Sequence, residues 1–204
     1  MSQATLERRS TALPSLSVPA ASTALWFFML VATSLFMLFL MAYAMRMDQP
    51  DWRRLPVPDV LWLSAAWLVL ASLTMQATVM IARRGRMEAA HQTMLAGGVC
   101  TLLFLCTQLW AWRVLGQSFA DTPASSFFYV LTALHGVHVL GGLWAWTVVW
   151  RRGVDGTRDD APDEVRLMTL CARYWHFLLA VWLVLFAALG WLTPELVRRI
   201  CGTG

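Results

Sequence analysis

The sequence has few charged residues, and its acidic residues are absent from the long apolar runs. Only 14% of the 204 residues are charged and 58% are hydrophobic, whereas a soluble domain of this size would carry nearly twice that share of charge. These proportions exclude an ordinary soluble domain and indicate a membrane protein. All twelve Asp and Glu residues fall in predicted loops or tails. Because a proton or ion carrier normally needs a carboxylate inside the membrane, transport is disfavoured.

Other classes of site also lack their usual residues. The four cysteines show no Cys-x-x-Cys spacing, so neither a disulfide framework nor a structural zinc site is indicated. The net charge of +4 comes from arginines in short clusters beside the apolar runs, where they orient helices in a membrane and do not form a nucleic-acid groove. We expect no catalytic residue, no metal site and no nucleic-acid partner for this chain.

Five apolar runs are long enough to cross a hydrocarbon core of about 30 Å as helices. The predicted fold is all-α: a polytopic membrane protein with five transmembrane helices in a bundle. The predicted tails are residues 1–21 and 194–204, and the membrane domain is residues 22–193. The predicted spans are residues 23–45, 60–82, 92–112, 127–150 and 168–192.

Arginine counts predict the orientation of the bundle. With five spans, the N-terminus, the second loop and the fourth loop share one side of the membrane. Together with Arg173 at the start of the fifth span, that side holds ten arginines against six on the other. Since positive charge is enriched in cytoplasmic loops, the N-terminus is predicted in the cytoplasm and the C-terminus outside.

The fourth span carries a stripe of polar and small residues. Residues three and four apart share one helix face, which groups Thr132, His135, His138 and Gly142. A ring N–H turned to lipid would lack a partner, so this face is predicted to pack on other helices. The favoured interpretation is hydrogen-bonded helix packing. The alternative is a stand-alone b-type cytochrome with His138 and His176 as its two haem ligands.

Two further features admit more than one interpretation. Gln108 of the third span could join the histidine stripe or lie at the membrane interface. The fifth span opens with Arg173, Tyr174, Trp175 and His176. Arginine and aromatic residues at this level are usual interface residues. A sharper hypothesis is that these residues, Arg173 and His176 above all, contact the headgroup of an anionic phospholipid between helices.

Two motifs resemble those of a known family. The fourth span reads FFxxLTxxHGxHV over residues 127–139, and the fifth reads RYWHF over residues 173–177. They resemble the fourth and last helices of subunit III of bacterial haem-copper oxidases, in the five-helix form. The first span matches through the aromatic run from Trp26 to Tyr43, and the third matches more loosely around Gln108.

The resemblance implies a non-catalytic subunit of a respiratory terminal oxidase in the bacterial inner membrane. Subunits I and II would be its partners, with the haems and copper in those partners and no cofactor in this chain. Its role would be to pack against subunit I, hold lipid and stabilise the complex during turnover. A same-family accessory subunit of a nitric oxide reductase is the nearest alternative, and the electron donor, cytochrome c or quinol, stays open.

Three positions depart from the family pattern. As we align it, the family usually has buried acids where this chain has Ala32, Ala111 and Leu179. Losing several members of a buried polar network together can be nearly neutral. We therefore hypothesise that His135, His138 and His176 are neutral and hydrogen-bonded to hydroxyls, to Gln108 or to each other.

Overall fold

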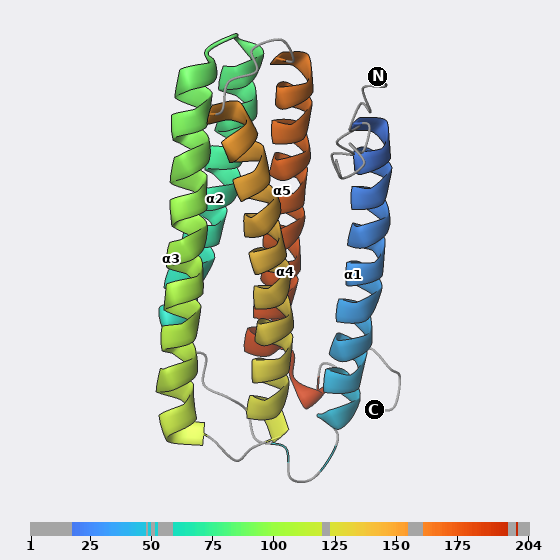
Figure 1. Ribbon diagram of the computed structural model, residues 1–204. Coiled ribbons are helices and arrows are strands. Elements are labelled where there is room, and N and C mark those ends of the chain that lie inside the picture. The colour runs from blue at the N-terminus through green and yellow to red at the C-terminus, as the bar shows by residue number, and fades with distance from the viewer. Residues whose placement is uncertain are drawn as a thin grey trace, which may run out of the picture.

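The computed structural model describes residues 18–47, 49, 52, 59–119, 123–154, 161–195 and 199. Those residues contain five long helices and no strand (Figure 1). Each helix includes a stretch long and apolar enough to cross a membrane, so the predicted all-α fold with five spans is confirmed. Most of the predicted tails, residues 1–17, 196–198 and 200–204, lie outside the described residues. The helices are α1 (Val18–Arg46), α2 (Val60–Arg83), α3 (Met87–Phe119), α4 (Pro123–Val154) and α5 (Ala161–Trp191).

The helices are longer than the apolar runs that predict them. The shortest, α2, has 24 residues and the longest, α3, has 33, which corresponds to roughly 36 to 50 Å at about 1.5 Å per residue. The first turns of α3 and α5 contain the acidic residues Glu88, Asp163 and Glu164. Carboxylates are favourable near the positive end of the helix dipole, so these helices continue into the polar headgroup region.

A tight turn joins α2 to α3. Gly85 adopts a φ of 76°, a conformation that glycine reaches without steric cost. Its N–H donates to the carbonyl of Ala82 at 2.9 Å, and the N–H of Arg86 donates to Ile81 at 3.4 Å. These two bonds form the Schellman arrangement that ends a helix. The turn therefore makes α2 and α3 an antiparallel hairpin and holds Arg83 at its end.

The core lies mainly between α2, α3, α4 and α5, which supply nearly all of the main buried cluster. In Figure 1, α1 stands at the side of this four-helix group. It packs mainly against α5 and less closely against α4, through a few buried residues that include Ala32, Phe36 and Tyr43. The start of α1 and the end of α5 lie at opposite ends of the bundle (Figure 1).

Candidate functional site

His135 lies inside the bundle, where side chains of α1, α3 and α5 meet α4. The residue is completely buried. Its ring stacks on Trp182 of α5 with a centroid distance of 5.3 Å and meets Phe104 of α3 edge-on at 5.7 Å. Phe36 of α1 lies 6.3 Å away. Aromatic rings from three other helices therefore pack on this imidazole.

The hydrogen-bonding hypothesis is wrong for His135. Neither of its ring nitrogens has a hydrogen-bond partner among the described residues, and the same is true of the side-chain oxygen and nitrogen of Gln108. Gln108 is buried in the bundle but does not bond the histidine. The physical reason is the identity of the neighbours: aromatic rings offer packing surface to an imidazole, not the carbonyl or hydroxyl oxygen that a ring N–H needs.

His138 faces α1. Its Nδ1 lies 2.8 Å from the carbonyl oxygen of Leu134, one turn earlier on its own helix. The rings of Phe28 and Phe36 lie 5.6 and 5.2 Å from it. Ala32 falls between these two phenylalanines on α1 and is buried. Aromatic side chains of α1 therefore pack on this ring.

His176 faces α2 and bonds through both ring nitrogens. Nδ1 lies 2.5 Å from the hydroxyl of Ser72, and Nε2 lies 3.1 Å from the side-chain oxygen of Gln76. His138 and His176 thus turn to different helices, and His176 has no nitrogen left for iron. This geometry does not favour the b-type cytochrome. The described part of the chain also contains no group of three or more His, Cys, Asp or Glu residues placed to hold a metal ion.

The other two members of the α4 stripe also contact neighbouring helices. The indole N–H of Trp112 on α3 donates to the hydroxyl of Thr132 at 2.9 Å. Gly142 faces α5, where a Cβ built on it would come within 2.7 Å of the ring of Tyr174. The four stripe residues therefore contact α1, α3 and α5, through ring packing, close approach and one hydrogen bond from α3.

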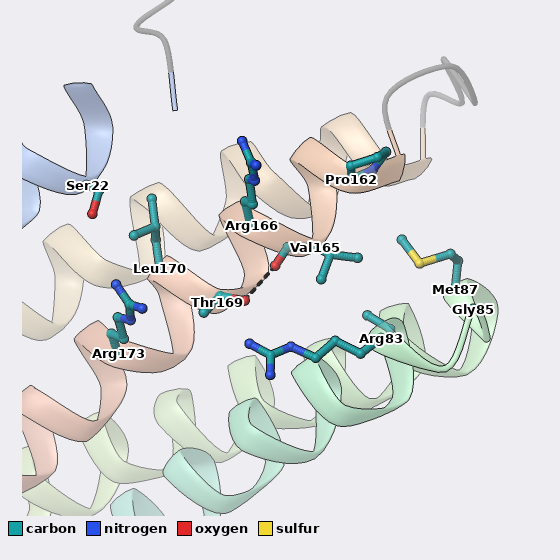
Figure 2. A pocket seen from close by; sticks show the side chains of 11 residues that line it. Ser22, Arg83, Gly85, Met87, Pro162, Val165, Arg166, Thr169, Leu170 and Arg173 are labelled. Atoms are coloured by element: carbon teal, nitrogen blue, oxygen red, sulfur yellow. Dashed lines mark hydrogen bonds between the residues drawn. The ribbon is translucent and has the colours of Figure 1, made fainter. Parts of the chain in front are cut away.

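An open cavity lies at the end of the bundle that contains the start of α5 (Figure 2). Its volume is about 770 Å³, and residues of α1, α2, α3 and α5 line it. Three of the lining residues are the arginines Arg83, Arg166 and Arg173, and none of them is acidic. In Figure 2, Arg83 extends from the end of α2 toward α5, from which Arg166 and Arg173 project. Cationic side chains from α2 and α5 therefore line this cavity.

Of the four residues predicted to contact a lipid headgroup, only Arg173 lines this cavity. Tyr174 is buried and donates its hydroxyl to the carbonyl of His138 at 2.9 Å. Trp175 is also buried, and its indole N–H donates to Thr101 of α3 at 2.9 Å. His176 is engaged by α2. Successive helical residues point about 100° apart, so four consecutive residues serve different neighbours.

The sequence analysis did not identify Arg83 and Arg166 as residues that line the same cavity as Arg173. The sequence contains a usable signal, because Arg166 and Arg173 are seven residues apart and so share one face of α5. The predicted topology also puts the end of the second span on the same side of the membrane. The contact of His91 with Glu164 was also missed, and it has no sequence signal. The His91 Nε2 lies 2.5 Å from the Glu164 Oε1, and this contact joins the starts of α3 and α5.

Similar proteins agree on one family. The family model described as cytochrome c oxidase subunit III matches residues 56–193, which include the whole of α2 to α5. A protein of Mycobacterium tuberculosis named probable cytochrome c oxidase subunit 3 is 30% identical over 125 residues, 60% of this chain and 61% of the relative. A protein of Nocardia farcinica with the same name is 29% identical over 127 residues, 61% of this chain and 62% of the relative.

A third relative matches a shorter part of the chain. The cytochrome c oxidase subunit 3 of Thermostichus vulcanus is 32% identical over 92 residues, which is 45% of each chain. The matches thus span about three fifths or less of the length of these curated relatives. The family model, however, covers about two thirds of this chain and contains all three histidine-bearing helices, α3, α4 and α5. The chain therefore belongs to the cytochrome c oxidase subunit III family.

Proposed function

We propose that this chain is the non-catalytic subunit III of a bacterial haem-copper terminal oxidase. A separate subunit I would carry the haems and copper and reduce oxygen, and subunit II would complete the complex. The observation that carries the proposal is the family match over residues 56–193. The histidine-rich face of α4 agrees with it, because its polar groups serve contacts between helices.

The proposed role is to stabilise the catalytic subunit by packing against it. The chain supplies a rigid surface for this, since α2 to α5 share one buried core. It also exposes many large apolar side chains, among them Phe27, Val31 and Leu38 on α1, each more than 60% exposed. In a bilayer such faces meet lipid or other transmembrane helices. We propose that subunit I covers part of these apolar faces and that membrane lipids cover the rest.

We further propose that the chain lies in the bacterial cytoplasmic membrane with its N-terminus inside. The start of α1, the turn between α2 and α3 and the start of α5 share one end of the bundle (Figure 1). That turn contains Arg84 and Arg86 directly after Arg83. Positive charge at this end supports a cytoplasmic location for it.

Copurification tests the proposal. The full chain, tagged at its C-terminus and extracted in mild detergent, is expected to bring a large haem-containing subunit with it. The purified complex should consume oxygen, and its haem spectrum should not change when His138 or His176 is replaced. Isolation of the chain without any such subunit would contradict the proposal. A complex that consumes nitric oxide and not oxygen would support the alternative, in which this chain accompanies a nitric oxide reductase.

Deletion of the chain separates a stabilising role from a catalytic one. The complex without it should start at a comparable rate of oxygen consumption but lose activity sooner during continuous turnover. An initial rate close to zero, with the remaining subunits correctly assembled, would instead mean that this chain takes part in the chemistry.

A further inference from the structure

Two polar side chains face outward within the membrane-spanning parts of α2 and α5. Gln76 and His176 are both exposed. Gln76 precedes Arg83, the last residue of α2, by seven residues, or about 10 Å. Because α2 is about 36 Å long and the hydrocarbon core is about 30 Å thick, Gln76 lies roughly 7 Å from the membrane midplane. His176 precedes Trp191, the last residue of α5, by fifteen residues, or about 22 Å. Both side chains therefore lie at hydrocarbon depth.

The hydrogen bonds at these residues form a chain with one direction. The Gln76 side-chain oxygen can only accept, so the His176 Nε2–H donates to it at 3.1 Å. The Nδ1 of the neutral ring is then an acceptor, and the buried hydroxyl of Ser72 donates to it at 2.5 Å. The chain runs outward from Ser72 and ends at the two N–H groups of the Gln76 amide. No described residue accepts from that amide nitrogen.

Exposed hydroxyl groups on α1 do not leave a donor in this way. Thr33 and Ser34 are exposed, and their hydroxyls donate to backbone carbonyls one turn earlier on α1, at 2.7 and 3.0 Å. Such a side chain is compatible with lipid because its own helix satisfies it. The amide of Gln76 is different, since acyl chains contain no acceptor and an unbonded N–H in hydrocarbon is costly. The surface at Gln76 is therefore suited to protein and not to acyl chains.

We infer that a transmembrane helix of the catalytic subunit packs on the α2–α5 face at Gln76 and His176 and offers a side-chain oxygen to the Gln76 amide. Polar side chains of neighbouring membrane helices pair in this way. The oxygen belongs to a side chain, because backbone carbonyls within a helix already accept from their own helix. The inference rests on the proposed function, and it specifies both the face of this chain that meets the partner and the chemistry of the contact.

The surroundings of Gln76 also suit a transmembrane helix. Leu73 and Met80, one turn before and after Gln76, are exposed apolar residues on the same face of α2. On α5, the residue one turn after His176 is the exposed Ala180, and a small residue lets a second helix approach closely. A polar contact surrounded by apolar and small residues is the usual composition of an interface between membrane helices.

The first experiment maps the face directly in native membranes. A photoreactive amino acid replaces Leu73 in the full-length chain, and after illumination the crosslinked polypeptide is identified by mass spectrometry. The matched control is the same replacement of Leu38 on α1, because the two leucines are 61% and 69% exposed. The position of Leu73 should crosslink to the haem-containing subunit and the position of Leu38 mainly to lipid. Crosslinking from Leu73 only to lipid, or only to a second copy of this chain, would overturn the inference.

The second experiment tests the hydrogen bond from the Gln76 amide. Q76M keeps the length of the side chain but removes both N–H donors. In mild detergent, the dissociation constant of the chain from the rest of the complex should rise roughly three- to fifteenfold, the range for polar contacts between membrane helices. S34A is the matched control, because it also removes an exposed polar group from a span and should leave the dissociation constant unchanged. An unchanged dissociation constant for Q76M would overturn the inference.

A further measurement separates contact with the partner from a role within this chain. Q76M also removes the oxygen that accepts from His176, so the unfolding of the isolated chain in mixed micelles is measured beside the dissociation constant. A weaker complex with little change in unfolding supports the inference. Easier unfolding with an unchanged dissociation constant would mean that Gln76 serves only the contact of α2 with α5, which overturns it. If Q76M does not fold, the crosslink from Leu73 decides, because that variant retains Gln76.

The same preparations distinguish failure of this inference from failure of the proposed function. If the haem-containing subunit copurifies with the chain but crosslinks from Leu38 and not from Leu73, the inference is overturned and the proposed function stands. If no haem-containing subunit copurifies or crosslinks from either position, the proposed function fails and the inference fails with it.

Discussion

Adding one methyl group at Gly142 should destabilise the bundle, whereas the same change at Gly141 should not. A Cβ on Gly142 would lie 2.7 Å from Cε1 of Tyr174 and 3.5 Å from Cδ1 of Leu178. The Tyr174 ring is held on both sides, since its hydroxyl donates to His138 at 2.9 Å and its face stacks on Phe177. The ring therefore cannot turn away without breaking a contact, and α4 must move from α5.

The magnitude follows from two opposing terms. Overpacking a close contact costs about 1–3 kcal/mol, and loss of the Tyr174 hydrogen bond costs about 1 kcal/mol more. Alanine improves helix propensity over glycine by about 1 kcal/mol. The net expectation for G142A is a loss of about 1–3 kcal/mol. For Gly141 no atom lies within 4 Å of the added Cβ, so G141A should be neutral or up to about 1 kcal/mol more stable.

Reversible unfolding in mixed micelles, with increasing denaturing detergent, measures this difference for the full chain. A second variant, G142A in a Y174A background, should cost less than G142A alone, because the obstructing ring is absent. If G142A unfolds within about 0.5 kcal/mol of G141A, the close approach of α4 and α5 at this position is not what the structure shows.

Two other hydrogen bonds between helices allow similar measurements. T101V removes the hydroxyl that accepts a hydrogen bond from the buried indole N–H of Trp175 at 2.9 Å. This change should cost about 1–3 kcal/mol in the same unfolding assay. A loss below about 0.5 kcal/mol would count against that bond. S72A removes one partner of His176 on the surface of the bundle and should cost only about 0.6 kcal/mol, the average for polar contacts between membrane helices. A larger loss from S72A than from T101V would reverse the expected order.

The sequence predicts the five helices because a membrane imposes a simple rule on apolar length. It predicts their ends less well, since apolar length marks only the hydrocarbon part of a helix. The first turns of α3 and α5 lie beyond it, with acidic residues such as Glu88 and Asp163.

The surroundings of the histidines were harder to predict. The spacing of His135 and His138 identifies a shared face of α4 but not the residues that meet it. His135 was expected to find a polar partner and instead packs on Phe36, Phe104 and Trp182. These three residues come from α1, α3 and α5, so their meeting depends on tertiary structure. The arginine-lined cavity was missed for a different reason, because the shared face of Arg166 and Arg173 was not recognised in the sequence.

The position of α1 has a consequence for biogenesis. This helix is synthesised before the other four, yet its main neighbours are α5 and α4, which follow α2 and α3 along the chain. The hairpin of α2 and α3 can close as soon as both segments have been inserted. Helix α1 must instead wait in the bilayer, without its final neighbours, until α4 and α5 have also been inserted. An insertase or an early-bound companion protein would find its greatest exposed surface on this segment during that interval.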